Sequence, residues 1–212
     1  MLANSTISGN KSGEPETEFE ERKRGGGIFV LFGELELTNV TVERNTARVG
    51  GGIFNNEANS AGGSVVLKNT VVSGSAGDNC SGTITSGGHN LSSDDSCGFS
   101  GPGDLQGVDP KLGPLADNGG ATQTHALLAG SPAIDAGEAA SCPAADQRGV
   151  ARPLDGNSDG LAACDIGAYE APAGTTGSVA SPTPSPSPEP AATPVPQPVR
   201  RPATGGFPQR SH

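Results

Sequence analysis

Three segments of this chain share one sequence frame, Leu-x-Asn-x-(Thr/Val)-(Ile/Val)-x-x-(Asn/Ser), and they begin at Leu2, Leu37 and Leu67. A second motif, Gly-Gly-Gly-Ile-Phe, occurs at residues 25–29 and returns at residues 50–54. Repeats of this length indicate one structural unit that stacks on copies of itself. Within each unit the apolar positions alternate, and their parity changes after the Asn, which predicts a strand, a bend and a second strand.

The repeats predict an all-β fold, a short right-handed parallel β-helix over residues 1–80. Stacking places the three leucines in one column and Asn4, Asn39 and Asn69 in a second column. We expect the Asn amides to hydrogen-bond from layer to layer, because polar groups at a buried bend need partners. The first repeat begins in mid-unit, so we expect further layers and an export signal upstream of Met1.

The rest of the chain predicts three other regions. Residues 14–24 are densely charged and are expected to form a solvated loop. Residues 81–170 are richer in Gly, Asp, Pro and Cys, and we expect a loop-rich capping module there, because the strand edges at the end of a β-helix need cover. Residues 171–212 are rich in Pro and predict a disordered linker.

The four cysteines, Cys80, Cys97, Cys142 and Cys164, form no Cys-x-x-Cys pair. Two disulfides are the natural interpretation, with three possible connectivities. The local pairing, Cys80–Cys97 with Cys142–Cys164, would stabilise the fold by about 3 kcal/mol for each closed loop. Disulfides imply an oxidising compartment, so we expect an extracellular or cell-surface protein. The alternative is four free thiols in a cytosolic protein.

The net charge of −10 argues against nucleic acid as a partner, because phosphate binding needs clustered Lys and Arg. No apolar run approaches the ~20 residues of a membrane span. We therefore expect no membrane span. We also expect a monomer.

The segment 155–160, Asp-Gly-Asn-Ser-Asp-Gly, matches the first half of an EF-hand calcium loop. Ca²⁺ needs about six or more oxygen ligands. The twelfth loop position, where a bidentate Glu should stand, is Ile166, so Asp165 or Glu170 would have to complete the shell. The candidate Ca²⁺ ligands are Asp155, Asn157, Asp159, Leu161 and Asp165. The alternative is a polar turn closed by Asp and Asn side chains.

Several runs downstream of the repeats share a family resemblance. They are Asp-Asn-Gly-Gly-Ala-Thr-Gln-Thr-His-Ala-Leu at 117–127, Ser-Pro-Ala-Ile-Asp-Ala-Gly at 131–137, Asp-Gln-Arg-Gly at 146–149, Arg-Pro at 152–153 and Cys-Asp-Ile-Gly-Ala-Tyr-Glu at 164–170. With the repeats, they resemble bacterial right-handed parallel β-helix proteins of the pectin-lyase-like superfamily that end in a choice-of-anchor Q domain. The resemblance covers about residues 1–170. It implies a cell-surface protein, and it carries no chemistry with it.

An enzyme of the lyase or hydrolase type would need carboxylates on neighbouring layers. In the aligned repeats, Glu34 falls over Ser64, Glu36 over Val66 and Glu43 over Ser73, so no acidic pair recurs. His89 and His125 lack a local nucleophile signature and are expected to be structural. The capping module also holds a charged set, which we expect to form a partly buried network. Its members are Asp135, Asp146, Arg148, Arg152 and Glu170.

These observations predict a non-enzymatic, adhesive or glycan-binding β-helix protein, with a surface polysaccharide or cell wall as its partner. A truncated polysaccharide lyase or hydrolase is one alternative. A structural surface spacer is the other. Ca²⁺ is the one cofactor that the sequence suggests.

Overall fold

The computed structural model describes residues 1–13, 24–56 and 63–175. These ranges contain eleven strands and one short 3-10 helix, η2 (Ala139–Ser141), and no α-helix. They belong to one compact unit, Met1–Val179. Most of the charged insertion and nearly all of the Pro-rich tail lie outside the described residues.

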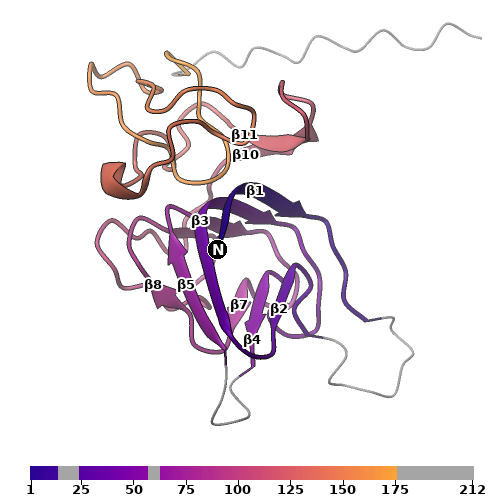
Figure 1. Ribbon diagram of the computed structural model, residues 1–212. Helices are drawn as coiled ribbons and strands as arrows, with labels where there is room; N and C mark the ends of the chain where they lie inside the picture. Colours follow the sequence, from indigo (N-terminus) through magenta and orange to yellow (C-terminus); the bar gives the residue numbers. More distant parts are fainter. Residues whose placement is uncertain (14–23, 57–62, 176–212) are drawn as a thin grey trace, which may run out of the picture. The chain divides into compact units, whose positions relative to one another are not determined.

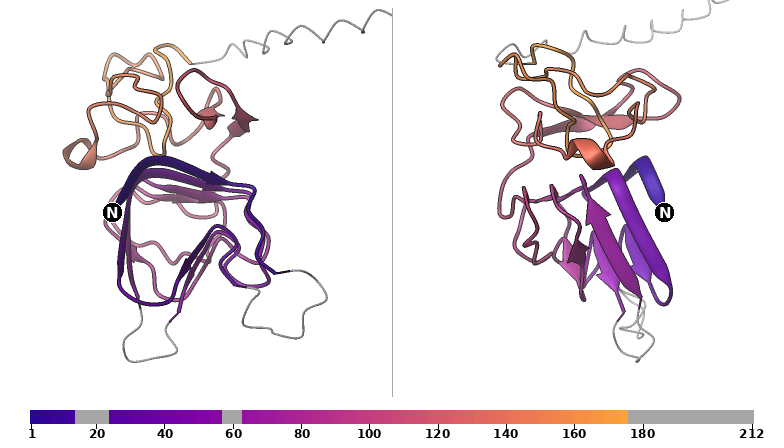
Figure 2. Two further views of the ribbon diagram at one scale, coloured as in Figure 1. Left: turned by 45° about the vertical axis from the view of Figure 1, so that its right-hand side comes forward. Right: turned by 60° about the vertical axis from the view of Figure 1, so that its left-hand side comes forward.

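Two parallel sheets form the N-terminal part of the fold (Figure 1). The larger sheet contains β1 (Leu2–Ser8), β3 (Glu34–Glu43), β5 (Ser64–Lys68), β6 (Val71–Ser73), β8 (Thr85–Ser86) and β9 (Leu91–Ser92). The smaller sheet has the order β2 (Ile28–Val30), β4 (Ile53–Asn55) and β7 (Cys80–Ser81). The long strand β3 pairs with β1 on one side and with β5 and β6 on the other. Together these strands make a curled parallel arrangement, which we call the parallel stack (Figure 2).

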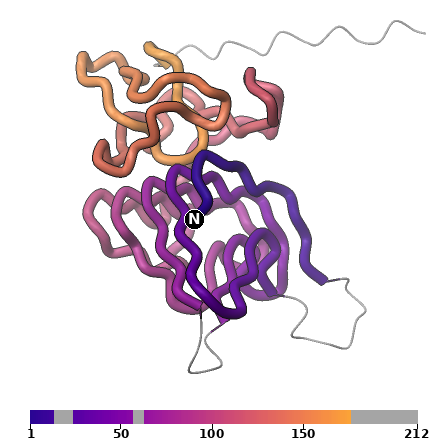
Figure 3. Tube along the Cα trace, viewed as in Figure 1, coloured from indigo at the N-terminus to yellow at the C-terminus, as the bar shows by residue number. Residues whose placement is uncertain are grey.

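The strand register confirms the alignment of the repeats. Leu2 is the partner of Leu37, which is in turn the partner of Leu67. Likewise, Ile28 is the partner of Ile53 in the smaller sheet. The turns of chain that carry these residues lie over one another in Figure 3. Equivalent positions of the repeat frame therefore lie on successive layers of the stack.

The Gly-Gly-Gly motif has a steric cause. A Cβ atom on Gly51 would lie 2.1 Å from the carbonyl oxygen of Ala76, and one on Gly26 would lie 2.5 Å from that of Gly51. No side chain can be accommodated at such distances unless the backbone moves. The glycines allow neighbouring layers to approach closely before each short strand of the smaller sheet.

The core of the stack is built from one face of each strand. Leu37, Leu67, Val42, Val72 and Ile53 are fully buried in one apolar cluster. On β6 the side chains alternate, because Val72 belongs to this cluster whereas its neighbour belongs to a second cluster on the outer face. The outer face of the larger sheet is therefore covered as well.

The parallel stack continues past the expected boundary at residue 80. Strands β8 and β9 add a further layer to β5 and β6, and Leu105 pairs in parallel with Leu91. Residues 93–106 then close this end of the stack, since Cys97 and Phe99 lie in its core. The disulfide between Cys80 and Cys97 links residues 93–106 to β7. The open strand edge at this end of the stack, which needs cover, is thus covered by residues 93–106.

The remaining residues, 109–175, form a loop-rich flank module. It contains the antiparallel pair β10 (Leu112–Ala116) and β11 (Thr124–Leu127), and a second disulfide, Cys142–Cys164. Its core includes Leu127, Ile166 and Tyr169, which pack with Val71 and Leu91 of the stack. The flank module lies beside β1 and β3 in Figure 1. The division into a repeat region, 1–80, and a capping module, 81–170, stays a prediction.

The Asn column is only partly the ladder that the sequence predicts. Asn69 donates to the Asn39 side-chain oxygen at 3.3 Å, but Asn39 donates to the carbonyls of Asp165 and Gly167. Asn4 donates to the carbonyl of Ala145 at 2.8 Å. Most of these amides thus hold the flank module. All three Asn residues have φ between 45° and 51°, a left-handed conformation that Asn tolerates better than most residues.

Candidate functional site

A column of polar side chains runs along the outer face of the larger sheet, where its strands end. Ser8 is the register partner of Glu43, and Glu43 is the partner of Ser73. These positions follow the core residues Ile7, Val42 and Val72, so their side chains point away from the core of the stack. Glu43 and Ser73 are nevertheless buried. The column therefore holds a carboxylate that is largely shielded from solvent.

Glu43 is held by two neighbours. The Ser73 hydroxyl donates to its Oε2 atom, and the Nε atom of Arg44 lies 3.2 Å from its Oε1 atom. The Arg44 side chain remains 64% exposed, so most of its guanidinium can still meet a ligand. A groove of roughly 410 Å³ opens beside these residues, and we call it the Glu43 groove. Its lining includes Glu43, Arg44, Ser73, Gly74, Ser93 and Asp109.

A second groove of roughly 450 Å³ lies on the outer face of β3 and β5. Its charged residues are Glu34, Glu36 and Lys68, and Lys68 bonds to Glu36 at 3.1 Å. Both partners of this ion pair are more than a third exposed. Such surface pairs contribute little to stability. The second groove is thus also polar, but it lacks a buried charge.

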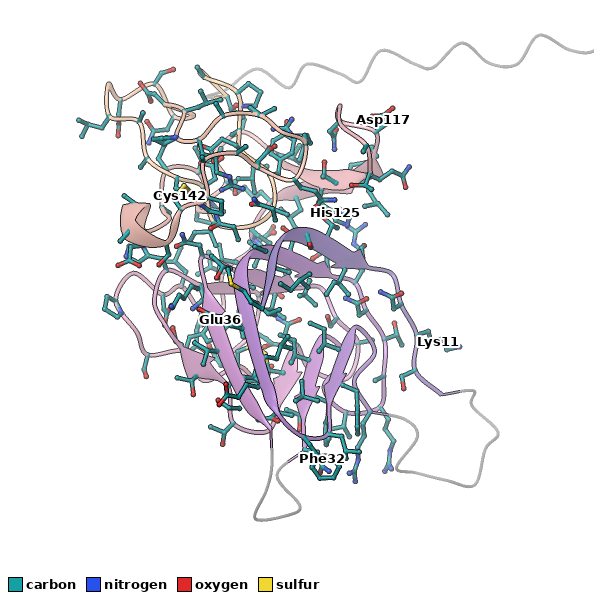
Figure 4. The ribbon with its side chains drawn as sticks, viewed as in Figure 1. Lys11, Phe32, Glu36, Asp117, His125 and Cys142 are labelled. Carbon is teal, nitrogen blue, oxygen red and sulfur yellow. A yellow bond between two sulfur atoms is a disulfide. The ribbon has the colours of Figure 1, made fainter. Side chains whose placement is uncertain are left out.

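Ser8 and His125 meet where β1 faces the flank module. The Ser8 Oγ atom lies 2.8 Å from His125 Nε2, and His125 Nδ1 lies 2.8 Å from the carbonyl oxygen of Gly113. A carbonyl oxygen only accepts hydrogen bonds, so in the neutral imidazole Nδ1 carries the proton. Nε2 then accepts from the Ser8 hydroxyl. Figure 4 shows His125 between β11 and β1.

The charged set of the flank module forms the buried network that the sequence predicts. Arg152 Nη1 lies 3.2 Å from Glu170 Oε2, and neither side chain is exposed. The same guanidinium donates to the carbonyls of Asp165 and Gly167. Arg148 pairs with Asp146 at 2.7 Å. These contacts tie the 146–152 and 164–170 segments together.

Asp165 lies in the same network, but among the described residues its carboxylate forms no ion pair within 4.0 Å. Its carboxylate accepts from the backbone N–H groups of Asp135 and Ala171. Burial, with a further contribution from the Glu170 carboxylate, raises the pKa of Asp165 to about 7. Burial also raises the pKa of Glu170 and lowers that of Arg152. The network therefore favours a protonated Asp165.

This pKa predicts that stability falls as the pH rises. A raised folded-state pKa means that the contribution of Asp165 is complete below its unfolded value near 4 and is lost as the pH passes through about 7. From pH 5 to pH 8, we expect the free energy of unfolding to fall by about 3 kcal/mol. Burial raises the pKa of Asp94, but hydrogen bonds from Ser96 and Asn79 lower it by more, so the net shift is downward. Its effect on stability therefore falls at a pH below this window.

Urea unfolding at pH 5 and pH 8 measures this dependence. The Asp165→Asn variant removes the titrating group, and its stability is expected to change much less over the same range. A wild-type protein that is more stable at pH 8 than at pH 5 would contradict the assignment.

The expected calcium ligands do not all come together. In the 155–160 loop, both oxygens of Asp155 and one of Asn157 accept backbone N–H groups of the loop itself, as in a polar turn. Asp159 accepts from the Leu161 N–H. Asp165 points into the buried network instead. Across the described ranges, no three His, Cys, Asp or Glu side chains are grouped to hold a metal ion. The calcium site stays a prediction.

Three other expectations, on the disulfides, His89 and a membrane span, can be compared with the structure. The disulfides follow the local pairing, Cys80–Cys97 and Cys142–Cys164. His89 is bonded through Nδ1 to the carbonyl of Ala136 at 2.7 Å, which agrees with a structural role. In the described part of the chain, no helix has the length and apolarity that a membrane crossing requires.

The sequence did not reveal the meeting of Ser8 with His125. Alternation along β1 places Ser8 on the outer face, but its partner lies 117 residues away. A further contact that the sequence did not reveal joins two amides: Asn10 donates to Asn45 at 3.0 Å, at the last position of the repeat frame. The frame contained the signal for this contact, because both repeats carry Asn there.

The chain matches no protein family model, no curated protein and no solved structure. The resemblance to pectin-lyase-like β-helix proteins therefore stays a prediction.

Proposed function

We propose that this chain is an extracellular or cell-surface right-handed parallel β-helix that binds a polysaccharide in the Glu43 groove. The buried Glu43 carboxylate, fixed by Ser73 and flanked by the exposed Arg44 guanidinium, is the observation that carries this proposal. The two disulfides support an oxidising compartment. The parallel register from layer to layer supports a β-helix.

The chemistry of the groove favours a sugar over other ligands. Glu43 and Asp109 offer acceptors, Arg44 offers donors, and Ser73 and Ser93 offer hydroxyl groups. Sugar hydroxyls both donate and accept, so they can satisfy such a mixed set. A purely apolar ligand would leave these polar groups without partners, which costs free energy. Because the chain carries a net charge of −10, a polyanion is a poor partner for the protein as a whole.

A glycoside hydrolase is the second candidate, because Glu43 and Asp109 line the same groove. Hydrolysis of a glycosidic bond uses two carboxylates on opposite sides of that bond. Glu43 belongs to the stack, whereas Asp109 lies at the start of the flank module. Because Asp109 is outside the repeats, a comparison of one repeat with the next cannot reveal this pair. Release of reducing ends from a bound polysaccharide would favour this candidate over simple binding.

A glycan array followed by calorimetry on the best ligand tests the proposal. We expect Glu43→Gln to lower the affinity about 10-fold or more, because a hydrogen bond to a charged group contributes about 1.5–3 kcal/mol. The matched control is Glu36→Gln in the second groove, which should bind as the wild type does. Failure to bind any glycan would overturn the proposal, as would equal affinities for both variants and the wild type.

A further inference from the structure

We propose that Ser8 and His125 form a catalytic dyad that cleaves acyl esters. This activity goes beyond glycan binding and departs from the expectation of a non-enzymatic protein. The substrate class is a short-chain acyl ester, such as an O-acyl group carried by a polysaccharide. That the acyl group sits on a glycan rests on the proposed function, whereas the ester chemistry does not.

The hydrogen bonds of His125 give the tautomer that a general base needs. Gly113 O holds the proton on Nδ1, which leaves the lone pair of Nε2 directed at the Ser8 hydroxyl at 2.8 Å. A nucleophile and base within about 2.6–3.2 Å, with the base oriented by a third group, is the arrangement that activates serine. Here the third group is a backbone carbonyl in place of a carboxylate. His125 is buried, so its orientation is fixed by packing.

Ser8 is open to a substrate even though its partner is buried. It is only partly buried, and the next residue is Gly9, where an added side chain would meet nothing within 4 Å. Ser8 also lies in register with Glu43, one strand away or about 4.8 Å. An ester on a glycan held in the Glu43 groove would therefore lie close to Ser8.

The reaction is balanced with water as the only co-reactant. Ser8 Oγ attacks the ester carbonyl carbon while its proton passes to His125 Nε2. The bond from that carbon to the alcohol oxygen breaks, and the alcohol leaves with the proton from Nε2. Water then attacks the carbonyl carbon of acyl-Ser8 and gives one proton to Nε2. The bond from that carbon to Ser8 Oγ breaks, the carboxylic acid leaves, and the proton passes from Nε2 to Ser8 Oγ.

His89 provides an internal comparison. It also bonds through Nδ1 to a backbone carbonyl, that of Ala136, but no Ser hydroxyl bonds to its ring in the described structure. If a histidine fixed in this way were sufficient for activity, His89 would also contribute. The proposal predicts that only the histidine with a serine partner does.

Two measurements on the whole chain test the dyad. The first is labelling with a fluorophosphonate, followed by peptide mapping, and we expect the label on Ser8. The second is hydrolysis of p-nitrophenyl acetate, a small ester that does not need the glycan groove. Ser8→Ala and His125→Gln are each expected to lower the enzyme-dependent rate about 100-fold, the scale of general-base assistance. His89→Asn should retain the wild-type rate.

The variants must be shown to fold, and Ser8→Ala is the smaller change. Its melting temperature and its two disulfides can be compared with those of the wild type. A folded Ser8→Ala variant that hydrolyses the ester as fast as the wild type would overturn the proposal, as would absence of label on Ser8 in the wild type. If the ester is cleaved but no glycan binds, the dyad stands and the proposed function falls.

Discussion

Replacement of Arg152 with methionine is expected to lower the free energy of unfolding by about 3–5 kcal/mol. The guanidinium is the partner of the fully buried Glu170 carboxylate and donates to two backbone carbonyls. Its removal leaves the Glu170 carboxylate without its cation and takes one donor from each carbonyl, to which Asn39 also donates. Urea unfolding at pH 7 measures the effect, and Lys68→Ala, which breaks an exposed pair, should cost less than about 1 kcal/mol.

A double-mutant cycle shows whether the cost arises from the uncompensated charge. Glu170→Gln removes that charge while it retains one acceptor oxygen. The double variant Arg152→Met/Glu170→Gln is expected to be more stable than the sum of the single effects by more than about 1 kcal/mol. Additive effects would mean that the two side chains act independently, against their 3.2 Å contact.

The Leu67→Ala variant is expected to lose about 2–5 kcal/mol of stability, the range for a deleted leucine in a packed core. Leu67 is the last leucine of the column and is fully buried between the layers of Leu37 and Ser86. A cavity there has no solvent-exposed wall that can collapse. Thermal or urea unfolding measures the loss.

Leu2→Ala is the matched control, because Leu2 belongs to the same column but lies on β1, which among the described strands pairs with β3 alone. Its side chain is only partly buried. We expect a cost below about 1.5 kcal/mol, in proportion to the smaller apolar area removed from water. Equal costs at Leu2 and Leu67 would contradict the position of Leu67 inside the stack.

The repeat frame predicted the register of the stack because side chains of the same kind lie over one another in successive layers. Leu37 over Leu67 and Ile28 over Ile53 follow directly from the spacing. The local disulfide pairing was also among the predictions, since short loops are the simplest to close. The right-handed β-helix stays a proposal.

The place of the flank module could not be predicted from periodicity, because residues 109–175 carry no repeat. Its position depends on contacts across long stretches of sequence, such as Asn39 with Asp165 and Ser8 with His125. The Asn column looked like a ladder since three equivalent amides usually bond to each other. Here the flank module offers closer acceptors, and only the Asn69–Asn39 bond remains.

Cysteine cross-linking on the outer face of the larger sheet tests the parallel stack most directly. Glu34 and Ser64 are register partners on β3 and β5. The Glu34→Cys/Ser64→Cys variant should therefore form a third disulfide, because adjacent strands bring Cα atoms within bonding range. Glu34→Cys/Lys68→Cys should form none, since four residues of offset separate the sulfurs by about 13 Å along the strand. The opposite outcome, a bond to position 68 and none to position 64, is what antiparallel strands would give, and it would contradict the stack.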